Sequence, residues 1–128
     1  MIADTTFIID LGKGDSRAFK KLNELKAQKE ALAITAVTTF ELFQGCGYLS
    51  EKEFRIFSKL IGAAMVIPVE HETAQLAGLI KSKLERKGIL IEALDCLIAG
   101  IVLLRKDALL TRNIKDFSRI EGLRLETY

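Results

Sequence analysis

Short apolar runs spaced along the whole chain are the feature that most constrains its fold. Each run has only two to four residues, which suits a strand and is too short for a helix. The runs are Ile2–Ala3, Ala31–Ile34, Met65–Ile67, Ala108–Leu110 and Leu123–Leu125. Most of them are apolar without alternation, which is typical of strands buried on both faces of a parallel sheet.

Segments with helical spacing lie between these runs. In Ser16–Lys29, Phe19, Leu22 and Leu25 recur every three residues opposite a lysine-rich face, which predicts an amphipathic helix. Further helices are expected around residues 7–9, 38–48, 51–61, 71–87, 92–105 and 113–117. Strands alternating with helices predict an α/β fold: a three-layer sandwich with a short-stranded, mostly parallel central sheet. The length of 128 residues fits one domain, 1–128.

Composition narrows the class of protein. Hydrophobic residues make up 49% and charged residues 28% of the chain, which favours a globular protein over a disordered one. The net charge of +2 permits a polyanionic partner without demonstrating one. The most apolar stretch, residues 89–104, is too short and too acidic to span a bilayer, so we expect no membrane segment. The absence of a secretory pattern and two widely separated cysteines predict a cytoplasmic location.

Four acids are placed where a parallel sheet would bring them together. Asp4 follows the first expected strand, Glu41 lies one turn into the helix after the second, and Asp116 is just beyond the fourth. Asp95 lies in the first turns of the buried helix. Ligands of such sheets gather at the carboxyl ends of the strands, so we expect these four carboxylates to converge at one edge.

Asp95 is the most informative of these acids because nearly all its neighbours are apolar. A buried, unpaired carboxylate is costly, so Asp95 needs hydrogen-bond donors, a cation or a metal. Glu92 shares the same helical face and is a possible extra acid. Alternatively, one or both of these acids only favour the N-terminus of the helix.

The other three acids also have structural alternatives. Asp4 could cap a helix. Glu41 could close a capping box with Thr38, and Asp116 could be a solvated acid on a short surface helix. The case for a functional site therefore depends on the presence of all four acids and on their order along the chain.

A carboxylate cluster suits hard divalent cations such as Mg²⁺ or Mn²⁺. Such ions can activate water, hold a phosphate oxygen and stabilise a leaving oxyanion. His71 is the only histidine, which excludes a ribonuclease with two catalytic histidines. The GxSxG, P-loop and GxGxxG motifs are absent from the sequence.

The segments that carry these acids resemble the motifs of the PIN-domain nucleases, and more narrowly of the VapC toxins of prokaryotic toxin–antitoxin pairs. They are Asp4–Thr6, Thr38–Leu42, Asp95–Ala99 and Thr111–Phe117. Thr6 departs mildly from the family's pattern. The resemblance implies a PIN α/β/α sandwich, endonucleolytic cleavage of RNA with Mg²⁺ or Mn²⁺, a small antitoxin as partner, and a homodimer.

The resemblance also implies roles for individual residues. Asp4, Asp95 and Asp116 would bind metal, and Glu41 would complete the acidic pocket. Candidates for supporting hydrogen bonds are Thr5, Thr111 and Asn113, and candidates for phosphate contacts are Arg86, Arg112 and Lys115. Ordinary surface charge explains these basic residues about as well.

Five of the nine aromatic residues, Phe40, Phe43, Tyr48, Phe54 and Phe57, fall in one 18-residue stretch. They could form an interface with a second subunit or an antitoxin helix. Core packing is the slightly favoured interpretation.

Two other functions compete with the nuclease. A phosphatase with an aspartate nucleophile needs a second acid two residues after the first, and Thr6 occupies that place. A PIN-like module that binds RNA or protein without cutting it remains the alternative.

Overall fold

A single five-stranded sheet organises the chain in a computed structural model that describes residues 1–128. The strands are β1 (Ile2–Ala3), β2 (Ala33–Thr35), β3 (Met65–Ile67), β4 (Ala108–Leu110) and β5 (Arg124–Glu126). Their order is β3-β2-β1-β4-β5, and every neighbouring pair is parallel. The predicted α/β class is therefore confirmed, with a sheet that is entirely parallel.

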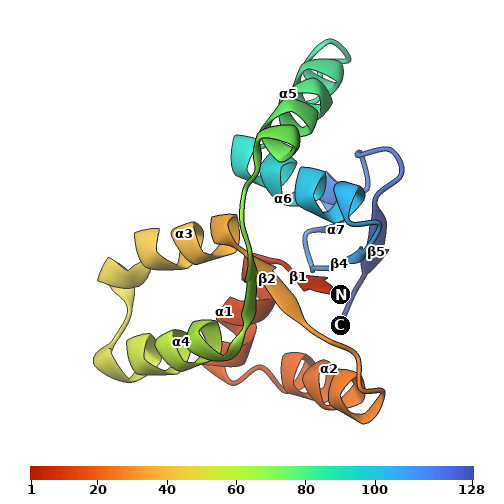
Figure 1. Cartoon of the computed structure of the whole chain (residues 1–128). Coiled ribbons are helices and arrows are strands. Elements are labelled where there is room, and N and C mark those ends of the chain that lie inside the picture. Colours follow the sequence, from red (N-terminus) through yellow and green to blue (C-terminus); the bar gives the residue numbers. More distant parts are fainter.

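Seven α-helices surround this sheet (Figure 1). They are α1 (Thr5–Lys13), α2 (Ser16–Ala27), α3 (Ala36–Gln44), α4 (Glu51–Ala63), α5 (His71–Glu85), α6 (Ala93–Leu104) and α7 (Ile114–Phe117). A short 3₁₀ turn, η1 (Cys46–Tyr48), separates α3 from α4. Helices α1, α2 and α4 lie on one side of the sheet, and α5, α6 and α7 lie on the other. None of the helices is both long and apolar enough to cross a membrane.

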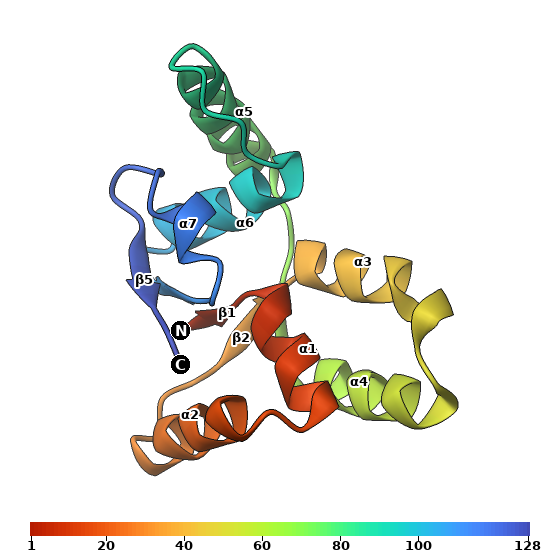
Figure 2. The ribbon, with the colours of Figure 1, turned by 180° about the vertical axis from the view of Figure 1, so that it is seen from behind.

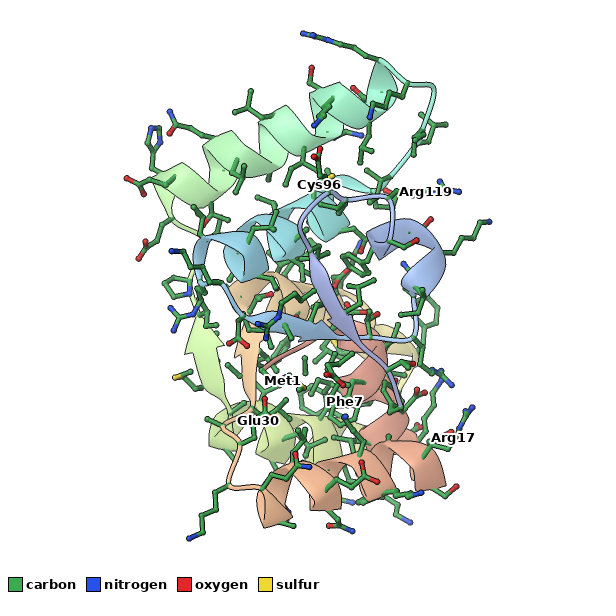
Figure 3. The ribbon with its side chains drawn as sticks, turned by 90° about the vertical axis from the view of Figure 1, so that its right-hand side faces the viewer. Met1, Phe7, Arg17, Glu30, Cys96 and Arg119 are labelled. Atoms are coloured by element: carbon green, nitrogen blue, oxygen red, sulfur yellow. The ribbon has the colours of Figure 1, made fainter.

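The strands divide their side chains between two hydrophobic cores because successive residues of a strand point to opposite faces. Ile2 and Leu109 pack under α5 and α6, whereas the next residues, Ala3 and Leu110, pack under α1 and α2. Figure 3 shows Cys96 and Phe7 in these two layers, on opposite sides of the sheet. This double burial explains why the strand runs are apolar without alternation.

Strand β1 lies at the point where the connections reverse direction. The chain passes from β1 to β2 and β3 on one side, then crosses back to β4 and β5 on the other. In open parallel sheets the crevice beyond such a switch point is the usual ligand site. Asp4 directly follows β1 and Thr111 directly follows β4, so the switch point lies between these two residues.

The start of α3 corrects one interpretation of the sequence. Thr35 caps this helix, accepting a 3.0 Å hydrogen bond from the Thr38 amide. Glu41 is the sixth residue of α3 rather than part of a capping box with Thr38, so the capping-box interpretation is wrong. The Glu41 carboxylate is therefore free to make contacts outside its own helix.

The core interpretation of the aromatic stretch is wrong for four of its five residues. Phe57 is buried, and its ring lies so close to Gly12 that a Cβ there would be 2.5 Å from it. The exposed four are Phe40, Phe43, Tyr48 and Phe54. Phe43 and Phe54 meet edge to face, with ring centroids 6.1 Å apart, so α3 and α4 present one aromatic surface.

Candidate active site

Asp4 occupies the centre of the switch point, where β1 ends and α1 begins. It is the N-cap of α1, and its Oδ1 accepts a 2.7 Å hydrogen bond from the Thr5 amide. Its Oδ2 accepts hydrogen bonds from the hydroxyls of Thr6, at 2.9 Å, and Thr111, at 2.7 Å. Capping therefore accounts for one oxygen only. Asp4 is 4% exposed, and its carboxylate is held in one orientation by donors from the start of α1 and from Thr111, the residue after β4.

Thr111 connects this carboxylate to the loop before α7. Its amide donates to the Glu126 carbonyl at 3.0 Å, which extends the pairing of β4 with β5. Its hydroxyl accepts a 2.9 Å hydrogen bond from the Asn113 backbone amide. Asn113 thus supports the site through its main chain.

Glu41 reaches the same place from α3. Its Oε2 accepts a short hydrogen bond from the Thr5 hydroxyl. Burial raises the pKa of Glu41, the Thr5 bond works against this, and the Asp4 charge adds to the rise. Thr5 therefore bridges two acids, through its amide to Asp4 and its hydroxyl to Glu41.

Asp95 is the third residue of α6 and is partly buried. Burial is the main influence that raises its pKa to about 7, followed by the charges of four neighbouring acids. In decreasing order of effect these are Asp4, Glu41, Asp116 and Glu92. Such mutual repulsion requires the acids to lie near one another. Figure 2 shows the first turns of α1, α3 and α6 gathered around the end of β1, with α7 beside them.

Asp116 and Glu92 lie at the more open side of this group. Asp116 is the third residue of α7, and its Oδ1 is 3.9 Å from the Arg119 Nη1. Glu92 is exposed and stands at the N-cap of α6 without a side-chain cap bond. We call Asp4, Glu41, Asp95 and Asp116 the acid site.

The donor set of the acid site fits a hard cation, although no three His, Cys, Asp or Glu side chains are grouped closely enough to hold one ion as they stand. Carboxylate oxygens are the ligands that Mg²⁺ and Mn²⁺ prefer. Every influence found on the Asp95 carboxyl favours its neutral form. A divalent cation would reverse that balance, because it stabilises the charged form of each nearby acid.

The three basic candidates differ in their surroundings. Arg86 and Lys115 are exposed, at the end of α5 and on α7. Arg112 is also exposed, but it turns back to α1, where its Nη2 lies 2.8 Å and 3.0 Å from the two carboxylate oxygens of Asp10.

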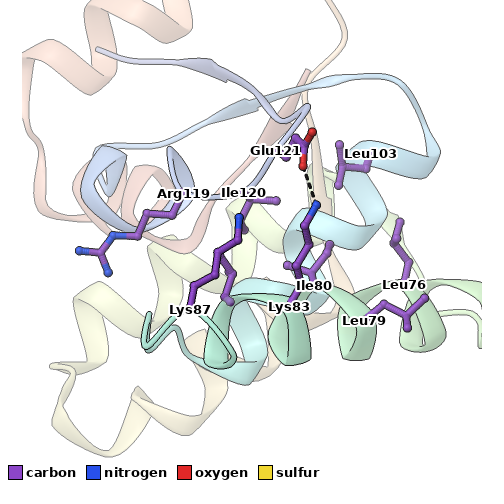
Figure 4. A pocket seen from close by; sticks show the side chains of 10 residues that line it. Leu76, Leu79, Ile80, Lys83, Lys87, Leu103, Arg119, Ile120 and Glu121 are labelled. Atoms are coloured by element: carbon purple, nitrogen blue, oxygen red, sulfur yellow. Dashed lines mark hydrogen bonds and ion pairs between the residues drawn. The ribbon is translucent and has the colours of Figure 1, made fainter.

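A hollow of about 260 Å³ lies between α5, α6 and the loop after α7, and none of the four acid-site residues lines it (Figure 4). Its lining is mainly aliphatic, and the Lys83–Glu121 ion pair of 2.6 Å stands at it. Arg119 both lines this hollow and pairs with Asp116. Arg119 is not among the basic residues expected from the sequence, although its place three residues after Asp116, just beyond the end of α7, is a usable signal.

Comparisons with known proteins agree with this architecture. A family model described as PIN domain matches residues 1–123. Ribonuclease VapC2 of Rickettsia felis is 32% identical over 108 residues, which cover 82% of this chain and 80% of that protein. The tRNA(fMet)-specific endonuclease VapC of Salmonella typhimurium is 28% identical over 99 residues, covering 76% of this chain and 75% of that protein.

Solved structures of similar proteins share the fold over nearly their full length. VapBC2 from Rickettsia felis, bound to a DNA fragment from their promoter, matches with a TM-score of 0.87 at 25% identity, covering 99% of this chain and 97% of that one. DNA-bound VapBC from Salmonella typhimurium matches with a TM-score of 0.84 at 25% identity, covering 98% and 96%. A parallel sheet with acids at its switch point, together with the family match, makes this chain a PIN-domain protein. Within that family it belongs to the VapC ribonucleases of VapBC toxin–antitoxin systems.

Proposed function

We propose that the chain is a metal-dependent endoribonuclease that hydrolyses RNA phosphodiester bonds at the acid site, as the toxin of a VapBC pair. The observation that carries this proposal is the convergence of carboxylates at the switch point, where Thr5 hydrogen-bonds both Asp4 and Glu41. The raised pKa of Asp95, to about 7, by burial and by the charges of Asp4, Glu41 and Asp116 agrees with it. Structural acids scattered over a surface would not repel one another in this way. We assign the cation as Mg²⁺ or Mn²⁺, with Asp4, Asp95 and Asp116 as its ligands and Glu41 completing the pocket.

The bound cation would supply positive charge that polarises a phosphate and makes a water molecule more acidic. The chain's own residues supply the positioning. Thr5, Thr6 and Thr111 fix both oxygens of Asp4, so this carboxylate needs no rearrangement to accept a ligand. Thr5 also holds Glu41 beside it. Preorganisation of this kind lowers the cost of assembling the charged site.

RNA is the substrate class that the relatives' names and the chemistry both favour. Arg86, Lys115 and Arg119 are exposed and are our candidates for phosphate contacts. Contacts of this type attract the backbone of any RNA and carry no sequence information.

The aromatic surface on α3 and α4 supports a homodimer. Phe40, Phe43, Tyr48 and Phe54 are each exposed, and Phe43 and Phe54 are in contact. Aromatic side chains anchor protein interfaces. We assign this surface to a second copy of the chain, and we propose a small antitoxin as a separate partner. The VapBC name of the related crystal structures supports the latter.

A cleavage assay tests the nuclease against its alternative, a PIN-like module that binds RNA or protein without cutting it. The purified chain should cut defined single-stranded RNAs in Mg²⁺ or Mn²⁺ and stop in EDTA. Asp95→Asn should abolish cutting, because an amide is a poor ligand for hard cations. Asp15→Asn is the matched control: Asp15 caps α2 outside the acid site, and asparagine preserves a cap. Binding of RNA without cutting would favour the alternative.

A further inference from the structure

Asp10 is a buried acid that none of the family motifs accounts for. It lies on α1 and is 7% exposed. Both of its oxygens are engaged. Arg112 Nη2 lies 3.0 Å from Oδ1 and 2.8 Å from Oδ2, and the Tyr128 hydroxyl donates to Oδ2 at 2.7 Å. We call Asp10, Arg112 and Tyr128 the Asp10 cluster.

The Asp10 cluster is packed as well as hydrogen-bonded. The Tyr128 ring meets the Phe7 ring edge to face, with centroids 4.8 Å apart and an interplanar angle of 78°. The Arg112 guanidinium carbon lies 5.7 Å from the centroid of the same Tyr128 ring. Three chain segments, α1, the loop after β4 and the residues after β5, therefore meet at one buried carboxylate.

Arg112 occupies a specific place relative to the acid site. It directly follows Thr111, which donates to Asp4, and it precedes Asp116 by four residues. Asp4 and Asp10 stand at the cap and in the second turn of the same helix. The segment from Thr111 to Asp116 is thus joined to the start of α1 at Asp4 through Thr111, and to its second turn at Asp10 through Arg112.

We infer that Arg112 is a positioning residue, which acts through Asp10 to hold the segment 111–116, the loop before α7 and the start of that helix, against α1 so that Thr111 and Asp116 face the acid site. This inference rests on the proposed function, and it replaces the phosphate contact expected for Arg112. An arginine that left Asp10 for a phosphate would leave this buried carboxylate without the arginine's charge and with only the Tyr128 hydroxyl as a side-chain donor, which is unfavourable. The charge of Arg112 is already neutralised by Asp10.

The test compares Asp10→Asn, Arg112→Gln and the double variant with the parent, using kcat, KM and the salt dependence of KM on one defined RNA. A positioning role predicts a fall of about tenfold or more in kcat with KM within about twofold. All three variants should lose a similar amount, because residues that act as one unit are not additive. Arg105→Gln, an exposed arginine at the far end of α6, is the matched control and should retain parental kinetics.

Two further measurements separate this role from plain structural support. Amide hydrogen exchange of residues 113–116 should become faster in Arg112→Gln while the core strands stay protected. The stabilisation of the fold by Mn²⁺ in thermal unfolding should weaken, because Asp116 is no longer held in place. Hydrogen exchange does not depend on catalysis, so it reports on the Asp10 cluster even if the parent chain proves unable to cut RNA.

The inference is overturned by either of two results. If Arg112→Gln raises KM and flattens its salt dependence while Asp10→Asn does not, Arg112 contacts RNA. If the folded variants keep parental kcat, Mn²⁺ response and exchange at residues 113–116, the Asp10 cluster has no positioning role. Should Arg112→Gln fail to fold, Tyr128→Phe and Arg112→Lys are smaller changes in the same cluster and decide by the same readouts.

Discussion

Thr111 donates a 2.7 Å hydrogen bond to Asp4 from a position 107 residues further along the chain. The bond joins the carboxyl ends of β4 and β1, the two strands between which the sheet reverses its connections. Both residues are buried, so the geometry of the acid site depends on contacts inside the fold rather than on a surface loop.

The Thr111→Val substitution should therefore impair the acid site while the chain keeps its fold. Valine keeps the volume of threonine but leaves Asp4 Oδ2 without one donor and the Asn113 amide without its acceptor. We expect a loss of about 1–3 kcal/mol in the free energy of unfolding and weaker stabilisation by Mn²⁺. Denaturant unfolding with and without Mn²⁺ measures both. Thr73→Val, at a buried threonine on α5, is the matched control for the loss of a hydroxyl and should not alter the Mn²⁺ response.

Stability should depend on pH through Asp95. Because its pKa is raised to about 7 in the folded chain, folded Asp95 keeps a proton that the unfolded chain releases near the ordinary value of 3.8. The free energy of unfolding should then fall as pH rises from about 4 to about 7. In EDTA, Asp95→Asn should show a smaller fall over this window than the parent. Parallel pH profiles for parent and variant would contradict the raised pKa.

Mg²⁺ or Mn²⁺ should stabilise the parent chain by mass action, by about 2.7 kcal/mol at a concentration 100 times Kd. Asp4→Asn, Asp95→Asn and Asp116→Asn should each respond less, while Asp15→Asn should respond like the parent. In EDTA, Asp95→Asn should unfold at the same temperature as the parent or higher, because the change relieves repulsion among the acids. Equal metal responses in all variants would mean that the acid site does not bind the cation.

Several parts of this arrangement follow from local sequence and could be predicted. The apolar runs located β1, β3 and β4 with their observed bounds, and the strand-end rule brought four distant acids to one region. The start of α3 is an exception, because the sequence predicts Thr38 as its cap and the helix begins three residues earlier. Thr38 and Thr35 are equally good capping residues. The end of β2 at Thr35 decides between them.

Contacts that depend on packing could not be predicted. Arg112 and Tyr128 both pair with Asp10. They lie 102 and 118 positions after it in the sequence. No local pattern distinguishes Arg112 from Arg86 or Lys115, since each is a basic residue with a polar neighbour in the sequence and all three are exposed. Only the fold shows that Asp10 is buried and that Arg112 is the cation beside it.

The aromatic surface on α3 and α4 gives the last prediction. If a second copy covers it, Phe43→Glu and Phe54→Glu should each turn a dimer into folded monomers, because a charge cannot be buried there without a partner. Both rings are substantially exposed in the single chain, so the fold itself should tolerate the change. Phe19→Glu on α2 is the matched control: it has a similar exposure, at 45% against 47% for Phe43, and should leave the dimer intact. Light scattering gives the mass of each variant, and circular dichroism checks that it is folded. A dimer that survives both substitutions would place the interface elsewhere, and a parent chain that is monomeric at all concentrations would leave the aromatic surface to a different partner.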